Sequence, residues 1–194
     1  LEILQKFVFL KKETVEDEHG RARRKSTLIF PRFHQWEAVT TMLAAVREEG
    51  AGKSYLIEHS AGSGKTNTIA WTAHRLLSTY GTDEQRVFDS VIVVTDRTVL
   101  DDQLQEAVRQ IERTSGTVVA VDRKNLGGEA TSKSALVKQT LLQGNRIIVV
   151  TLQPFPAVLE LLKGDSTLAG RTYAVIADEA HSSQTGSAAA KLKR

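Results

Sequence analysis

The sequence predicts an α/β fold, in which a mostly parallel sheet carries helices on both faces. Short apolar runs of the strand type alternate along the chain with longer segments whose apolar residues recur at helical spacing. This alternation is typical of parallel strands joined by crossover helices. Two of the runs, residues 91–94 and 146–151, lack the polar alternation of a half-exposed strand. We therefore expect both to be buried on both faces of the sheet.

Composition agrees with one globular core. The chain has 194 residues, of which 41% are hydrophobic and 25% charged, values typical of a folded soluble domain. No apolar run approaches the roughly 20 residues of a membrane span. Cysteine is absent, which excludes disulfide scaffolds, zinc ribbons and thiol nucleophiles and fits a reducing cytoplasm. The formal net charge of +3 permits nucleic-acid binding without demanding it.

The expected elements follow in order. Residues 1–30 form a lead-in with a charged loop, and residues 31–194 form the α/β domain. Residues 11–25 are almost entirely polar, which indicates a solvated hairpin tip or linker, or else a basic loop that contacts DNA. Trp36 and Trp71 are assigned to the core. Helices are expected over residues 33–47, 66–80, 98–113, 133–142 and 155–162, and strands over residues 54–57, 91–94, 117–121, 146–151 and 173–177.

A glycine-rich loop lies between the first expected strand and the helix after it. Gly62 and Gly64 allow successive backbone N–H groups to turn inward on an anion, and the helix dipole points at the same place. Lys65 would place its charge on the β- and γ-phosphates of ATP, and the Thr66 hydroxyl would bind Mg²⁺. His59 stands where the strict pattern has glycine, which favours helicase-type loops over kinases and small GTPases. The predicted nucleotide-binding residues of this loop are Ala61, Gly62, Ser63, Gly64, Lys65 and Thr66.

The strand expected over residues 173–177 ends in the tetrapeptide Asp-Glu-Ala-His. Its carboxylates would lie at the carboxyl edge of the sheet, beside the phosphate loop. Asp178 would hold Mg²⁺, and Glu179 would orient and deprotonate the attacking water. Mg²⁺ and Lys65 would carry the charge that develops on the γ-phosphate. His181 is either a loop hydrogen-bonding residue or a link between the nucleotide and a nucleic acid.

The phosphate loop and the acidic tetrapeptide together resemble those of the first RecA-like lobe of superfamily 2 helicases and translocases. Residues 33–39 are similar to the glutamine motif of these motors. Further motifs are similar in sequence to the motor subunit of type I restriction endonucleases. They comprise residues 95–103, 151–155 and 182–186, together with His59. The resemblance covers the whole chain.

The resemblance implies roles for further residues. Gln35 would make a bidentate contact to adenine, unless it is a surface residue at the start of its helix. Phe33 or Trp36 could stack on the base, as an alternative to the core position assigned to Trp36. Arg97, Thr98, Thr151 and Gln153 would bond phosphate oxygens of a nucleic acid without reading its bases. Two of these have alternatives, because Arg97 could be a surface charge and Thr151 a buried hydroxyl at a strand end.

For the whole protein, the resemblance implies ATP hydrolysis coupled to sequence-nonspecific movement along double-stranded DNA, which feeds a separate nuclease domain. The implied partners are double-stranded DNA, the modification and specificity subunits, and a second RecA-like lobe and the nuclease domain of the same chain. The place of action would be a bacterial or archaeal cytoplasm, with no membrane. Because the second lobe supplies an arginine to the transition state, we expect the 194-residue chain to hold nucleotide weakly and to hydrolyse it barely.

Other functions are compatible with the same motifs. The chain could belong to a type III restriction motor or to another superfamily 2 DNA or RNA helicase. A P-loop phosphotransferase is a different class, but no acceptor site or lid can be recognised after Gly81. A non-catalytic nucleotide-binding module is the third class, and the intact Lys65, Asp178 and Glu179 argue against it.

Overall fold

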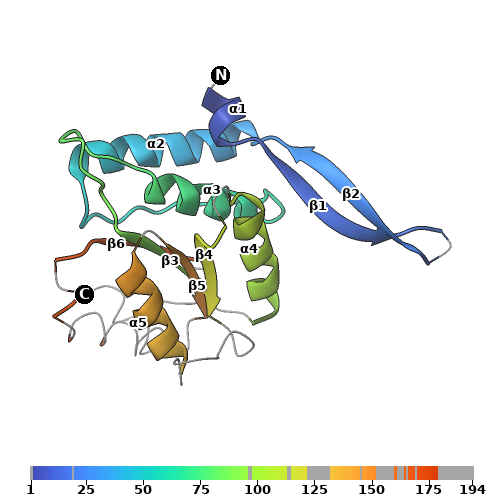
Figure 1. Ribbon diagram of the computed structural model, residues 1–194. Coiled ribbons are helices and arrows are strands. Elements are labelled where there is room, and N and C mark those ends of the chain that lie inside the picture. The colour runs from blue at the N-terminus through green and yellow to red at the C-terminus, as the bar shows by residue number, and fades with distance from the viewer. Residues whose placement is uncertain are drawn as a thin grey trace.

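The computed structural model of the chain contains a four-stranded parallel sheet between two layers of helices, with a β-hairpin that projects to one side (Figure 1). The sheet has the order β4-β5-β3-β6. Its strands are β3 (Ser90–Thr95), β4 (Val118–Val121), β5 (Ile147–Thr151) and β6 (Tyr173–Ala177). The structure describes residues 2–18, 20–95, 98–112, 115–121, 132–144, 146–151, 160, 164, 166–168 and 170–178.

The two central strands are buried along their whole length. Every residue of β3 and of β5 is buried, and most are valine or isoleucine, whose branched side chains pack well on a pleated surface. The two strands pair in parallel from Val91↔Ile147 to Thr95↔Thr151. The predicted burial of these runs on both faces is confirmed.

Helices cover both faces of the sheet. The odd-numbered valine and isoleucine residues of β3 and β5 join the core cluster that contains α3 (Lys65–Leu77) and α4 (Thr98–Gln110), with α2 (Phe33–Glu49) packed on α3. The even-numbered valine and isoleucine residues join a second cluster with α5 (Lys133–Gln143). This division follows from the alternation of side chains along a strand. The expected α/β class is therefore confirmed.

Most of the expected elements are present, with small differences at their ends. The helix expected over residues 66–80 ends earlier, at Leu77. The helix expected over residues 155–162 lies almost wholly outside the described residues. No helix in the described part of the chain combines the length and the apolar character needed to cross a membrane.

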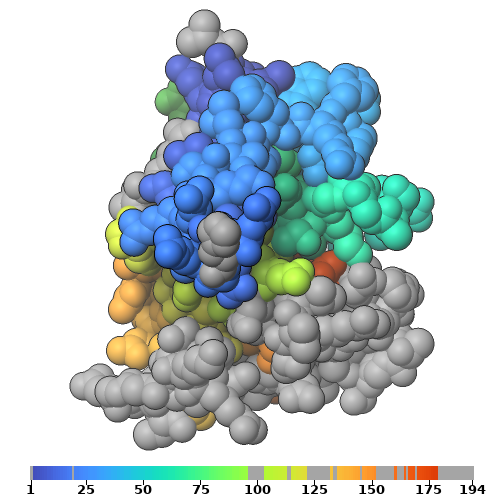
Figure 2. Space-filling model, turned by 90° about the vertical axis from the view of Figure 1, so that its right-hand side faces the viewer, coloured from blue at the N-terminus to red at the C-terminus, as the bar shows by residue number. Residues whose placement is uncertain are grey.

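The charged lead-in forms the hairpin. After the short helix α1 (Glu2–Lys6), β1 (Phe9–Glu16) pairs antiparallel with β2 (Ala22–Ile29). Asp17 closes the turn, because its carboxylate and its N–H both bond the backbone of Arg21. Figure 2 looks from the side on which the hairpin projects and shows it in blue in front of the body. Residues 11–25 lie in a hairpin as predicted, but most of them form its paired strands and the turn lies between β1 and β2, and the alternative of DNA contact stays a prediction.

Trp71 ties this N-terminal segment to the core. Its side chain is fully buried, and its indole Nε1–H donates to the Phe7 carbonyl oxygen at 2.7 Å. The rings of Phe7 and Phe9 lie with their centroids 6.0 and 5.9 Å from the indole. The assignment of Trp71 to the core is confirmed, whereas Trp36 is partly buried at the margin of the same cluster.

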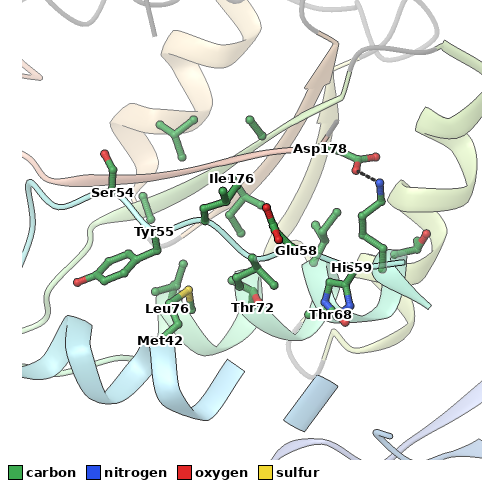
Figure 3. A pocket seen from close by; sticks show the side chains of 18 of the residues that line it. Met42, Ser54, Tyr55, Glu58, His59, Thr68, Thr72, Leu76, Ile176 and Asp178 are labelled. Atoms are coloured by element: carbon green, nitrogen blue, oxygen red, sulfur yellow. Dashed lines mark ion pairs between the residues drawn. The ribbon is translucent and has the colours of Figure 1, made fainter. Parts of the chain in front are cut away.

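The strand expected over residues 54–57 is wrong, because this segment pairs with no described strand. Within the described sheet β6 pairs with β3 alone, and an open hollow of about 2290 Å³ is lined both by β6 and by residues 52–62. Leu56 of the segment and Val175 of β6 are exposed in consequence. Figure 3 shows the hollow, with Tyr55 and Ile176 among its lining side chains. An apolar run indicates strand character, but a strand also needs a neighbour to receive its hydrogen bonds.

Replacing Trp71 by phenylalanine should lower the free energy of unfolding by about 1–3 kcal/mol, because the buried Phe7 carbonyl loses its donor. Urea denaturation followed by circular dichroism measures this loss. Leu28→Ala, at a side chain that is 55% exposed on the hairpin, is the control and should change the value by less than about 0.5 kcal/mol. Equal stability of Trp71→Phe and the wild type would show that the indole does not anchor the segment.

Candidate nucleotide-binding site

The phosphate loop has the backbone that an anion-binding turn requires. Gly62 and Gly64 adopt φ angles of 73° and 84°, in the left-handed region that costs other residues roughly 1–2 kcal/mol. A hydrogen bond from the Ser63 N–H to the Ser60 carbonyl oxygen closes the turn at 3.2 Å. The glycines therefore occupy the positions at which the loop changes direction.

Helix α3 begins directly at the end of this loop. Gly64 is its N-cap residue, and no side chain caps the first turn. The first backbone N–H groups of a helix have no partner within the helix, and the helix dipole makes that end positive. The first turn, which includes Lys65 and Thr66, therefore presents donors and positive charge to an anion bound in the loop.

An ion pair joins the loop to the carboxyl edge of the sheet. Lys65 Nζ lies 3.5 Å from Asp178 Oδ1, and the Asp178 side chain is only 12% exposed. The Asp178 N–H donates to the Val94 carbonyl oxygen at 2.9 Å, which extends the β3–β6 ladder by one residue. Figure 3 shows the pair as a dashed line. The fold thus brings together two of the predicted catalytic residues from distant parts of the chain.

The same residues suit a nucleotide with Mg²⁺. Magnesium ions in nucleotide sites use one or two carboxylates together with phosphate oxygens and water. Thr66 lies in the first turn beside Lys65, which is paired with Asp178, so a hydroxyl and a carboxylate are present at this corner. Among the described residues, no cluster of three or more His, Cys, Asp or Glu side chains could hold a metal by itself. The metal would therefore depend on the phosphates for its other ligands.

Gln35 lies against the phosphate loop. Its side-chain Nε2 donates to the carbonyl oxygens of Ser63 at 3.2 Å and of Gly64 at 2.9 Å. Its Oε1 accepts from the Arg32 N–H at 2.8 Å. The residue is only 3% exposed, so the alternative of a surface residue is wrong. The predicted adenine contact stays a prediction, and both ends of the amide are engaged with protein atoms.

Two histidines lie beside the loop. The ring centroids of His34 and His59 are 5.6 Å apart, and His34 Nε2 lies 3.2 Å from the Ser63 carbonyl oxygen. Partial burial lowers the pKa of His59 below its ordinary value of 6.5, and the nearby His34 and Lys65 lower that pKa further. His59 is therefore neutral at pH 7.

Three neighbouring strands end at one level of the sheet. Thr95 of β3 is the register partner of Thr151 of β5, and Asp178 follows directly after β6. Both threonines are buried, and the Thr95 hydroxyl has no hydrogen-bond partner among the described residues. The site prediction left out Thr95, although its place at the end of a buried strand was a usable signal.

The side chains of several predicted site residues are not among those that the structure describes. Thr98 is the first residue of α4, and its side chain is not described. The others lie outside the described residues, so their roles stay predictions: Arg97, Gln153, Glu179 and His181.

A phosphate loop that opens a helix, with an acidic residue at the carboxyl edge of a parallel sheet, is the arrangement of a P-loop NTPase lobe, and the family match narrows this class to the helicase-like ATPase lobes of superfamily 2. Residues 34–194 match the sequence profile of the SWI2/SNF2 ATPase family. The chain belongs to the SWI2/SNF2 ATPase family. No curated protein sequence matches the chain.

His59 should make stability depend on pH. Because its pKa is lowered in the folded state, the folded chain binds fewer protons than the unfolded chain as the pH falls through about 6.5. The contribution of neutral His59 to the free energy of unfolding is complete above about pH 6.5 and is lost as the pH falls below it. His59→Asn should therefore lose less stability than the wild type between about pH 7.5 and about pH 5.5. Urea denaturation across this range measures the difference, and parallel curves would contradict the assignment.

Proposed function

We propose that this chain is the ATP-binding lobe of a DNA translocase of the type I restriction kind. ATP hydrolysis would drive sequence-nonspecific movement along double-stranded DNA and feed a separate nuclease domain. The observation that carries the ATPase part is the contact of Lys65 with Asp178 across the phosphate loop and the sheet edge. The family match supports an ATPase lobe. The restriction assignment is supported by the sequence similarity to the type I motor subunit at residues 95–103, 151–155 and 182–186.

The residues of the loop and sheet edge divide the work of hydrolysis. A bound Mg²⁺ would neutralise charge on the phosphates. Lys65 would exchange its contact with Asp178 for the β- and γ-phosphate oxygens, and Asp178 would then hold the metal together with Thr66. Glu179 would accept a proton from the attacking water. The Lys65–Asp178 pair keeps both groups at the required corner before nucleotide binds.

DNA would cross the carboxyl edge of the sheet. Thr151 ends β5 at this edge, and Arg97, Thr98 and Gln153 follow the two central strands. Hydroxyl, amide and guanidinium groups bond phosphate oxygens without reading bases. We propose that the partners are double-stranded DNA, the modification and specificity subunits, and the second RecA-like lobe and nuclease domain of the full-length chain.

Stimulation of ATP turnover by nucleic acid separates this function from its alternatives. In the full-length protein, linear double-stranded DNA of any sequence should raise turnover, and the affinity for DNA should fall steeply with salt. Stimulation by RNA alone would favour an RNA helicase. DNA-stimulated turnover without restriction activity would favour another translocase of the same family. Transfer of phosphate to a small metabolite would contradict all of these.

Lys65→Ala should lower ATP turnover by at least about a hundredfold, because the charge facing the γ-phosphate is lost. A phosphate-release assay on the full-length protein measures this. Lys53→Ala, which removes an exposed lysine in the segment before the loop, is the matched control and should leave turnover unchanged. Undiminished turnover in Lys65→Ala would remove the phosphate-loop assignment.

Glu179→Gln should leave ATP binding intact and lower hydrolysis by about 10²–10⁴-fold, since an amide cannot accept the proton of the attacking water. Equilibrium dialysis with ATP and single-turnover hydrolysis give the two quantities separately. Loss of binding in this variant would show that Glu179 holds the nucleotide and does not act on water.

A further inference from the structure

Side chains in the first turn of α2 contact the backbone of the phosphate loop. Gln35 Nε2 donates to two consecutive loop carbonyl oxygens, those of Ser63 at 3.2 Å and Gly64 at 2.9 Å. His34 Nε2 lies 3.2 Å from the Ser63 carbonyl oxygen on the same side. Gln35 is 3% exposed, so its amide lies out of reach of water. A buried amide that is satisfied in this way is costly to displace.

These bonds set the direction of the loop's peptide groups. In a planar trans peptide the C=O points opposite to the N–H of the next residue. Since Gln35 draws the carbonyls of Ser63 and Gly64 toward α2, the N–H groups of Gly64 and Lys65 face the other way. The Gly64 carbonyl also accepts from the Asn67 and Thr68 N–H groups inside α3, so the Lys65 N–H points out of the N-terminal end of that helix. This is the direction from which an anion is bound.

Gly64 is fitted to this contact. A Cβ atom at Gly64 would lie 2.6 Å from Gln35 Nε2, closer than real contacts allow, and its φ of 84° already disfavours other residues. The close approach of Gln35 therefore adds a second reason for glycine at this position. The contact between Gln35 and the loop therefore depends on glycine at position 64.

A contact with adenine would need the same atoms. Reading the adenine edge takes one donor and one acceptor of the amide, whereas Oε1 accepts from the Arg32 N–H at 2.8 Å and Nε2 serves the loop. We propose that Gln35 is a positioning residue that holds the phosphate loop for a triphosphate of any base, which departs from the adenine contact that the resemblance implies. The inference rests on the proposed function of the chain as an ATP-binding lobe.

The test measures binding of three probes to the full-length protein: Mg-ATP, Mg-GTP and inorganic triphosphate. Gln35→Ala should weaken all three by the same factor, of about tenfold, since the loss of about one buried hydrogen-bond donor is felt whatever the base. Loss of affinity for ATP alone would overturn the inference in favour of base reading. Unchanged affinity for all three would also overturn it. Glu37→Gln, at an exposed residue of the same helix, is the matched control.

A second variant separates positioning from capping of the helix. Gln35→Glu keeps an oxygen for the Arg32 N–H, so it preserves the cap, but it removes the donors to the loop. At about pH 8, where the carboxyl is ionised, it should weaken binding of the three probes at least as much as Gln35→Ala, and it should lower the midpoint of thermal unfolding, because a carboxylate buried against two carbonyl oxygens has no donor. Full affinity in Gln35→Glu would overturn the inference, because the cap alone would then explain the residue.

Coupling with Gly64 gives a third readout. Gly64→Ala should weaken binding strongly in the wild type and less in the Gln35→Ala background, where the overlap with the amide is absent. Strictly additive losses would contradict the inference. A wild-type full-length protein that binds none of the probes would overturn the proposed function and this inference with it, whereas a loss confined to ATP overturns only the role of Gln35.

Discussion

Burial of β3 and β5 on both faces is the constraint on which the rest of the molecule depends. Parallel strands need long crossover connections, and the helices in those connections must cover both faces of the sheet. Here α3 and α4 lie on one face and α5 on the other. Because the strands run in the same direction and in register, Thr95, Thr151 and Asp178 are brought to one edge.

The candidate site lies at that edge of the sheet. Helix α3 packs on the sheet with its N-terminal turn beside the end of β6, so Lys65 meets Asp178 although neither lies near the other in the chain. The glycines of the loop allow the turn that aims backbone donors at a phosphate. Gln35 then links this corner to α2. The corner that we propose as the triphosphate site therefore lies at the junction of two helices and one strand.

Sequence patterns predicted the secondary structure where burial alone decides it. The apolar runs predicted β3 and β5 correctly, and the helical spacing predicted α2 correctly. Each of these patterns reflects the burial of that segment alone. Residues 54–57 have the same apolar character but form no strand, because strand formation also depends on which neighbour offers hydrogen bonds. Gln35 shows the same limit at the site, since its motif identified the residue but not that its amide bonds the loop.

By itself the sequence determined the α/β class, the phosphate loop from Ala61 to Thr66 and the acidic residue that ends the last predicted strand, because these are local patterns of apolar and glycine-rich residues. Only the tertiary structure decided that Lys65 pairs with Asp178, that Gln35 is buried against the loop, and that Thr95 lies at the same edge. The physical reason is that such contacts depend on strand order and helix packing, which join distant segments and which the local pattern of each segment does not specify.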